Sequence, residues 1–115
     1  MKYMLLVYAD PDGFAALKPA EAQAAMAGYA AFTEALEKEK ALLHSQRLKP
    51  TSQATTVHVE NGTPKVLNGP YVETKEQLGG YFLIEAPDLD AAIKWAARCP
   101  GSHHGSVEVR PVWEM

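Results

Sequence analysis

The alternation of apolar and polar residues along the chain predicts strands and helices in the order β, α, β, hairpin, β, α, β. The segment from Lys2 to Ala9 is apolar at nearly every position, as expected of a central strand covered on both faces. The other predicted strands run over Ala41 to Leu48, Ala54 to Glu60, Pro64 to Leu67, Tyr81 to Ala86 and Ser106 to Val112.

Two segments carry apolar residues at helical spacing. The first runs from Pro19, whose fixed φ suits a first helical position, to Lys40. Its expected buried stripe is Ala22, Ala25, Met26, Tyr29, Phe32 and Leu36. The second follows Asp88 as N-cap and ends at Pro100-Gly101. Its expected buried stripe is Leu89, Ala92, Ile93 and Ala96.

Local turn chemistry separates these elements. Asp10 to Gly13 ends the first strand, and Asn61-Gly62 predicts a hairpin turn. Thr74-Lys75-Glu76-Gln77 fits a capping box, which predicts a short helical turn there. The complete order is that of an α+β, ferredoxin-like βαββαβ sandwich with a hairpin insertion, in which two helices cover one face of an antiparallel sheet.

The opposite face of that sheet mixes apolar and charged residues. If Phe82, Ile84 and Ala86 pack under the helices, strand alternation turns their neighbours away. The residues expected on this second face are Tyr81, Leu83, Glu85, Ser106, Glu108 and Arg110, with Tyr3 or Met4 from the first strand. Soluble monomers rarely expose an apolar surface of this size, so the face predicts a homodimer that pairs through it. Its charged residues then form either an interface ion-pair network or a substrate pocket.

Composition narrows the function classes. The 115 residues predict one domain over 1–115. No apolar run approaches the roughly 20 residues of a membrane span. With 11 basic and 14 acidic residues, the net charge is −3 and no basic stripe is present, which argues against nucleic-acid binding. Cys99 is the one cysteine, so no internal disulfide is expected, and the cytoplasm is the expected compartment.

One stretch and the C-terminal region resemble a known family. The stretch runs from Asn68-Gly69-Pro70-Tyr71-Val72-Glu73 through Gly79-Gly80 to Ala86, and the C-terminal part runs from Ala96 to Val112. Both resemble the DGPF-domain branch of the YCII-related proteins. The opening strand and Ala54-Thr55-Thr56-Val57 are also similar, so the likeness covers nearly the whole chain.

The resemblance implies ferredoxin-like protomers that pair as a dimeric α/β-barrel. Some YCII-type relatives eliminate hydrogen chloride from chloroaromatic compounds and use a histidine on the first helix. The helix predicted from Pro19 to Lys40 contains no histidine, and the motif reads Asn68-Gly69-Pro70-Tyr71 instead of Asp-Gly-Pro-Phe. DGPF proteins are also often encoded beside extracytoplasmic-function sigma factors, which implies a regulatory connection.

The chemistry-bearing residues give a short set of candidates. His104 matches the family's C-terminal pattern and is the leading acid/base candidate, ahead of His44 and His58. The catalytic candidates are therefore His104, Glu73 and Glu85, and the substrate-binding candidates are Arg47, Tyr81 and Arg110. Each has a simpler interpretation as a surface, packing or ion-pairing group. Cys99 is expected to pack at a helix end, and no cofactor or metal is expected.

Two hypotheses about function follow. The first is a dimer that binds a small anionic or aromatic molecule and catalyses proton-transfer chemistry such as isomerisation or elimination. The second is a non-catalytic interaction or regulatory module on the same scaffold.

Overall fold

Two separate antiparallel sheets make up the β-structure of this computed structural model, which describes residues 1–114 except the side chain of Phe14. The strands are β1 (Lys2–Ala9), β2 (Leu42–Arg47), β3 (Thr55–Glu60), β4 (Thr63–Asn68), β5 (Gln77–Glu85) and β6 (Ser106–Pro111). The helices are α1 (Pro11–Ala15), α2 (Pro19–Lys38), α3 (Leu89–Arg98) and α4 (Gly101–His104), with a 3₁₀ turn η1 (Thr51–Gln53).

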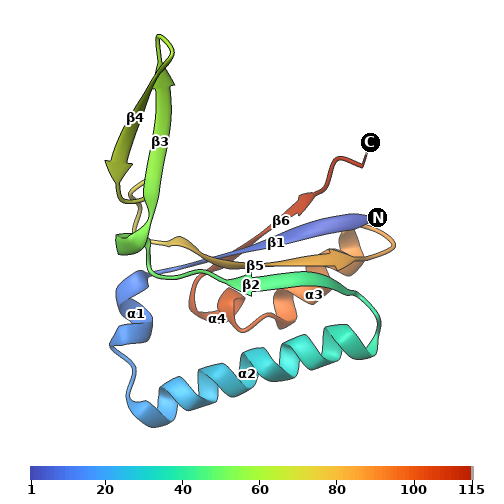
Figure 1. Ribbon diagram of the computed structural model, residues 1–115. Helices are drawn as coiled ribbons and strands as arrows, with labels where there is room; N and C mark the ends of the chain where they lie inside the picture. The colour runs from blue at the N-terminus through green and yellow to red at the C-terminus, as the bar shows by residue number, and fades with distance from the viewer. Residues whose placement is uncertain (115) are drawn as a thin grey trace.

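The larger sheet has the strand order β2-β5-β1-β6, with every neighbouring pair antiparallel. Without the β3–β4 hairpin, the elements β1, α2, β2, β5, α3 and β6 give the βαββαβ order expected from the sequence. Figure 1 shows α2, α3 and α4 on one side of this sheet and the hairpin rising from the other. The predicted α+β, ferredoxin-like architecture with a hairpin insertion is confirmed.

The core lies between the sheet and the helices. Alternate residues of β1 face it: Tyr3, Leu5 and Val7 are at most 7% exposed. The ring of Phe82 meets that of Phe32 edge-on, with 5.0 Å between centroids, and Phe32 meets Trp95 at 6.2 Å. Burying each such large side chain contributes roughly 1.5–3 kcal/mol. Strand β1 is therefore covered by helices on one face only, and Tyr3 is a core residue, not the open-face residue that the sequence suggested.

The helical faces differ in part from the predicted stripes. Phe32 and Leu36 are buried, but Met26 is 50% exposed because α2 diverges from the sheet toward its N-terminal end (Figure 1). On α3, Leu89 and Ile93 are about half exposed. The buried residues of α3 are Ala92, Trp95 and Ala96. The apolar pattern could not reveal that the indole of Trp95 turns inward to meet Phe32.

Several local signals act as predicted. Asp88 caps α3 by accepting a hydrogen bond from the amide of Ala91 at 2.8 Å. The hairpin turn forms at Asn61-Gly62, where both residues have positive φ, 50° and 77°. Such a turn matches the twist of the flanking strands.

Other local signals are overridden. No helical turn forms at Thr74–Gln77: the Thr74 hydroxyl donates to the carbonyl of Glu76, and Gln77 begins β5. The turn residues after β1 start α1, with Asp10 accepting from the Asp12 amide at 3.0 Å. The Pro100-Gly101 stop ends α3, but α4 follows directly.

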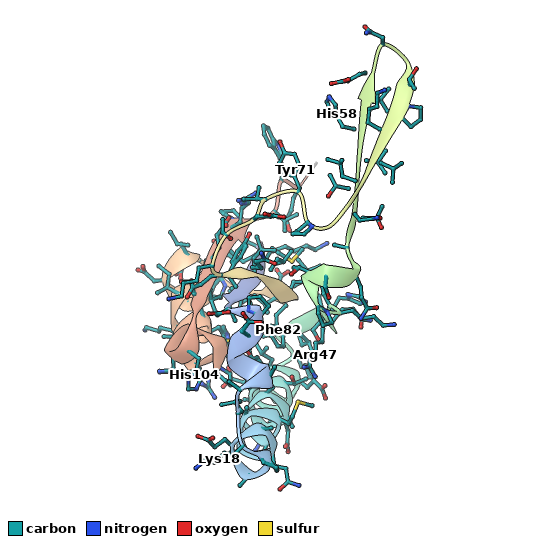
Figure 2. All side chains as sticks on the ribbon, turned by 90° about the vertical axis from the view of Figure 1, so that its left-hand side faces the viewer. Lys18, Arg47, His58, Tyr71, Phe82 and His104 are labelled. Atoms are coloured by element: carbon teal, nitrogen blue, oxygen red, sulfur yellow. The ribbon has the colours of Figure 1, made fainter. Side chains whose placement is uncertain are left out.

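The β3–β4 hairpin stands away from the rest of the molecule (Figures 1 and 2). One of its faces is apolar, since Val57 lies opposite Val66 and Val59 opposite Pro64. Val57, Val59 and Val66 are each more than half exposed. The hairpin therefore adds little to the core.

Candidate functional site

We call the side of the four-stranded sheet opposite the helices the open face. Strand register places alternate residues there, as the sequence predicted for β5 and β6. The open-face residues are Lys2, Met4, Leu6, Tyr8, His44, Gln46, Tyr81, Leu83, Glu85, Ser106, Glu108 and Arg110. Across the strands, Tyr81 pairs with Leu6, and Leu6 pairs with Glu108.

His44 and Tyr81 form a hydrogen-bonded pair on the open face. The Tyr81 hydroxyl lies 2.7 Å from Nδ1 of His44, and the two rings stack with centroids 5.7 Å apart and planes 26° apart. The β2–β5 ladder shifts register between Leu42 and His44, so His44 lies opposite Leu83 and on the same face of the sheet as Tyr81. An imidazole and a phenol in contact can both donate and accept protons.

Three charged open-face residues have ion-pair partners. Nε of Arg110 donates to Oε2 of Glu108 at 2.6 Å, and the guanidinium Nη2 contacts the same oxygen. Oε1 of Glu85 lies 2.7 Å from the amino group of Met1. Both pairs are solvent-exposed, and such ion pairs contribute at most about 1 kcal/mol. Arg110 thus has the Glu108 partner expected in its simpler interpretation, whereas Glu85 pairs with the chain terminus.

The six candidates from the sequence do not converge on one place. Tyr81, Glu85 and Arg110 share the open face, and Glu73 is exposed in the loop before β5. Arg47 lies on the helix side, where Nη1 is 3.8 Å from Sδ of Met26. His104 is exposed on α4, and Figure 2 shows His104 and Arg47 well apart, with Phe82 between them.

His44, which the sequence ranked behind His104, is the histidine that lies on the open face. Its strand was recognised, but the neighbour of that strand in the sheet was not specified. No local signal could have placed it: Leu42 packs with the core, so strict alternation would turn His44 to the same face, and only the register shift between Leu42 and His44 puts it on the open face.

A hollow of about 740 Å³ lies where the open face meets the base of the hairpin, and we call it the end hollow. Its apolar lining includes Leu48, Pro50, Ala54, Pro70, Val72 and Leu78. Its polar lining includes Tyr8, Lys49, Thr51, Gln53, Tyr71, Thr74, Glu76 and Gln77. Sequence reasoning did not find it, because its walls come from β1, the η1 region and the loop before β5.

Two polar side chains of the end hollow are fixed by neighbours. Oε1 of Glu76 accepts a hydrogen bond from the Ser106 hydroxyl at 2.8 Å. Nε2 of Gln77 donates to the carbonyl of Thr74 at 3.0 Å, while its buried Oε1 has no hydrogen-bond partner. Buried oxygens are usually paired, so this one lacks a donor that such groups normally have.

Tyr29 and Cys99 form a buried polar contact beneath the helices. Burial, together with the neighbouring Cys99, raises the pKa of Tyr29 to about 12. Burial also raises the pKa of the Cys99 thiol, which is fully inaccessible. Cys99 is therefore a packing residue, as expected, because a nucleophilic cysteine needs an accessible thiolate.

Within residues 1–114, no three His, Cys, Asp or Glu side chains come together as a metal site. None of the helices in the same range is both long and apolar enough to cross a bilayer.

Comparison with known proteins gives matches over the full length of the chain. The family model described as the YCII-related domain matches residues 1–115. An uncharacterised protein of Rhizobium meliloti (strain 1021) is 34% identical over 114 residues, which cover 97% of this chain and 92% of the relative. The solved 5-chloro-2-hydroxyhydroquinone dehydrochlorinase TftG of Burkholderia phenoliruptrix AC1100, in complex with 2,5-dihydroxybenzoquinone, is 16% identical with a TM-score of 0.49. That alignment covers 99% of this chain and 94% of the other.

Proposed function

The chain belongs to the YCII-related domain family, and from that premise we propose that it binds a small anionic or aromatic molecule and transfers a proton on it through His44 and Tyr81. The observation that carries the proposal is the 2.7 Å contact between Nδ1 of His44 and the Tyr81 hydroxyl. An imidazole exchanges protons near neutral pH, which suits general acid/base catalysis.

The direction of the hydrogen bond, and with it the tautomer of His44, decides which ring nitrogen reacts. When Nδ1–H of His44 donates to the oxygen of Tyr81, Nε2 carries no proton and acts as the base. Nε2 then takes a proton from the substrate, and the electron pair left behind enters a conjugated system. Returning that proton to another carbon gives isomerisation, and loss of a leaving group gives elimination.

Neighbouring open-face residues supply a binding surface. Leu6 and Leu83 lie beside Tyr81 and His44 in adjacent strands and form an apolar floor. Arg110 pairs with Met4, which in turn pairs with Leu83, so the backbone of Arg110 lies two strands, roughly 10 Å, from β5 and three strands, roughly 14 Å, from His44 on β2. A small aromatic anion fits between them, with Arg110 binding its negative group.

The proposal includes a homodimer formed through the open face. Met4, Leu6 and Leu83 are only partly buried within one chain. A second copy would remove this apolar surface from water and enclose His44 and Tyr81 in a drier space, where proton transfer is less disturbed by solvent. A single domain over residues 1–115, membership of the DGPF branch and a cytoplasmic location are parts of the same proposal.

Hydrogen–deuterium exchange into phenylpyruvate tests the chemistry. This aromatic anion has acidic protons beside its carbonyl, so abstraction by His44 in D₂O replaces them with deuterium, which proton NMR follows. We expect the protein to accelerate exchange above the rate in buffer. His44→Gln should return the rate to that of buffer, and Tyr81→Phe should lower the acceleration on the order of 10²-fold.

His58→Gln provides the matched control, because His58 lies on the hairpin away from the open face (Figure 2). It should exchange phenylpyruvate as fast as the unsubstituted protein. Equal rates with protein and buffer would reject proton transfer. That result would favour the other hypothesis, a non-catalytic interaction or regulatory module, including its link to an extracytoplasmic-function sigma factor.

A further inference from the structure

The end hollow has the size and lining of a small-molecule site distinct from the His44–Tyr81 pair. At about 740 Å³ it lies within the range of ligand pockets, roughly 300–1,000 Å³. Leu48, Pro50, Pro70 and Leu78 give it apolar walls. Neither His44 nor Tyr81 lines it, although Tyr8 belongs both to the open face and to the hollow.

Two tyrosines belong to the lining of the hollow and offer ring faces to a flat ligand. Tyr8 comes from the end of β1, and Tyr71 from the loop before β5. Tyr71 is 87% exposed, so a bound ring would shield surface that is now in water. Aromatic pairs gain from stacked or edge-to-face contact beyond simple burial.

Gln77 lines the hollow and carries a side-chain oxygen that has no hydrogen-bond donor among the described residues. Nε2 of Gln77 is already held by the Thr74 carbonyl, which fixes the orientation of the amide. Its Oε1 is buried and has no partner, so a donor on a ligand reaches it only when the Gln77 side chain turns toward the hollow that it lines. Glu76 also lines the hollow; Ser106 engages its Oε1, which leaves Oε2 as an acceptor. Both groups favour an O–H or N–H donor.

Lys49 supplies the complementary charge. It is the one basic residue in the described lining of the hollow, on the chain that leads from β2 to η1. An ammonium group binds carboxylates as a point charge with three donors. From these residues we infer that the end hollow is a binding site for a small aromatic carboxylate that also carries a hydroxyl or amino donor.

Binding of three probes tests this inference. 4-Hydroxybenzoate has both the donor and the carboxylate, benzoate lacks the donor, and phenol lacks the carboxylate. Titration followed by amide NMR should show 4-hydroxybenzoate binding roughly tenfold more tightly than either, with shifts centred on Tyr8 and Gln77. Equal affinities for all three probes, or no shifts at millimolar concentration, would overturn the inference.

Two variants assign the selectivity to named groups. Lys49→Met should bind 4-hydroxybenzoate no better than phenol, and Gln77→Met should bind it no better than benzoate. Lys38→Met, at the end of α2, is the matched control and should keep the full preference. Because Gln77 also bonds Thr74, the thermal midpoint of Gln77→Met is measured first, and its affinities are compared with those of the unsubstituted protein only if the variant is folded. Lys49 is exposed, so its variant reports on binding even if Gln77→Met fails to fold.

The outcome is separable from that of the proposed function. His44→Gln should abolish proton exchange and leave 4-hydroxybenzoate binding unchanged. If His44→Gln abolished both proton exchange and 4-hydroxybenzoate binding, and the amide shifts of the unsubstituted protein were centred on His44, the ligand would lie on the open face. That result would contradict a separate site.

Discussion

The hydroxyl of Tyr81 and Nδ1 of His44 lie 2.7 Å apart although the residues are 37 positions apart in the chain. Strands β2 and β5 are neighbours in the sheet although the β3–β4 hairpin lies between them in the chain. The register shift after Leu42 then puts His44 on the same face of the sheet as Tyr81. The acid/base pair is thus a product of strand pairing and not of a local motif.

Replacing Tyr81 by Phe removes the hydroxyl from this pair and keeps the ring. We expect the free energy of unfolding to fall by less than about 1 kcal/mol, because both groups are partly in water. The ¹⁵N NMR signal of His44 Nδ1 should move clearly, while the signals of His58 stay in place. An unchanged His44 spectrum would mean that the two side chains are not bonded in solution.

Leu83→Lys puts a charge in the centre of the open face. If a second copy covers this face, light scattering should give twice the 12.5 kDa chain mass for the unsubstituted protein and the single-chain mass for the variant. Ile93→Lys is the matched control, since Ile93 is 48% exposed on α3, on the other side of the sheet. It should remain a dimer. A single-chain mass for the unsubstituted protein at micromolar concentration would contradict dimerisation.

Stability should decline in alkali because of Tyr29 and Cys99. Burial raises the pKa of the Tyr29 hydroxyl from 10.0 to about 12 and raises that of the Cys99 thiol above 9.0. Above pH 9 the unfolded chain therefore loses protons that the folded chain keeps, so the free energy of unfolding falls as pH rises toward 12.

Denaturant unfolding at a series of pH values checks this trend. Tyr29→Phe should flatten the part of the decline between pH 10 and about 12. Tyr71→Phe is the control: Tyr71 is 87% exposed, and its loss should leave the curve unchanged. A Tyr29→Phe curve parallel to that of the unsubstituted protein would show that Tyr29 ionises alike in both states.

Gly105 allows β6 to approach β1 closely. A Cβ at this position would lie 2.2 Å from the carbonyl oxygen of Tyr8, a backbone atom that cannot turn aside. Gly105→Ala should lower the free energy of unfolding by at least about 1–3 kcal/mol. Gly13→Ala has only an ordinary contact at 3.8 Å and lies in α1, so it should be neutral or stabilising by about 0.5–1 kcal/mol. Urea unfolding measures both, and a stable Gly105→Ala protein would contradict the close approach.

Part of the fold could be predicted because its signals are local. The Asn61-Gly62 turn needs two residues with positive φ, and Asp88 needs only the amide of Ala91 three residues later. Strand alternation likewise separated Phe82 and Ile84 from Tyr81 and Leu83. The order of elements then left few arrangements open, and the ferredoxin-like one was observed.

The candidate site was harder to predict. Tyr81 and Arg110 were placed correctly on the open face, but Arg47 and His104 lie on the helix side. A single sequence shows which residues carry chemistry and not which of them meet. The Thr74–Gln77 pattern failed for a related reason: a capping box stabilises a helix weakly, and joining β5 to β1 gives Gln77 a strand position instead.

By itself, the sequence determined the periodicity of each strand and helix, the caps and the hairpin turn, because these depend on interactions within a few residues. The tertiary structure alone decided that His44 meets Tyr81, that Trp95 fills the core in place of Ile93, and that Gln77 lines the end hollow. Each of these depends on strand order and register, which are set by the packing of the whole chain.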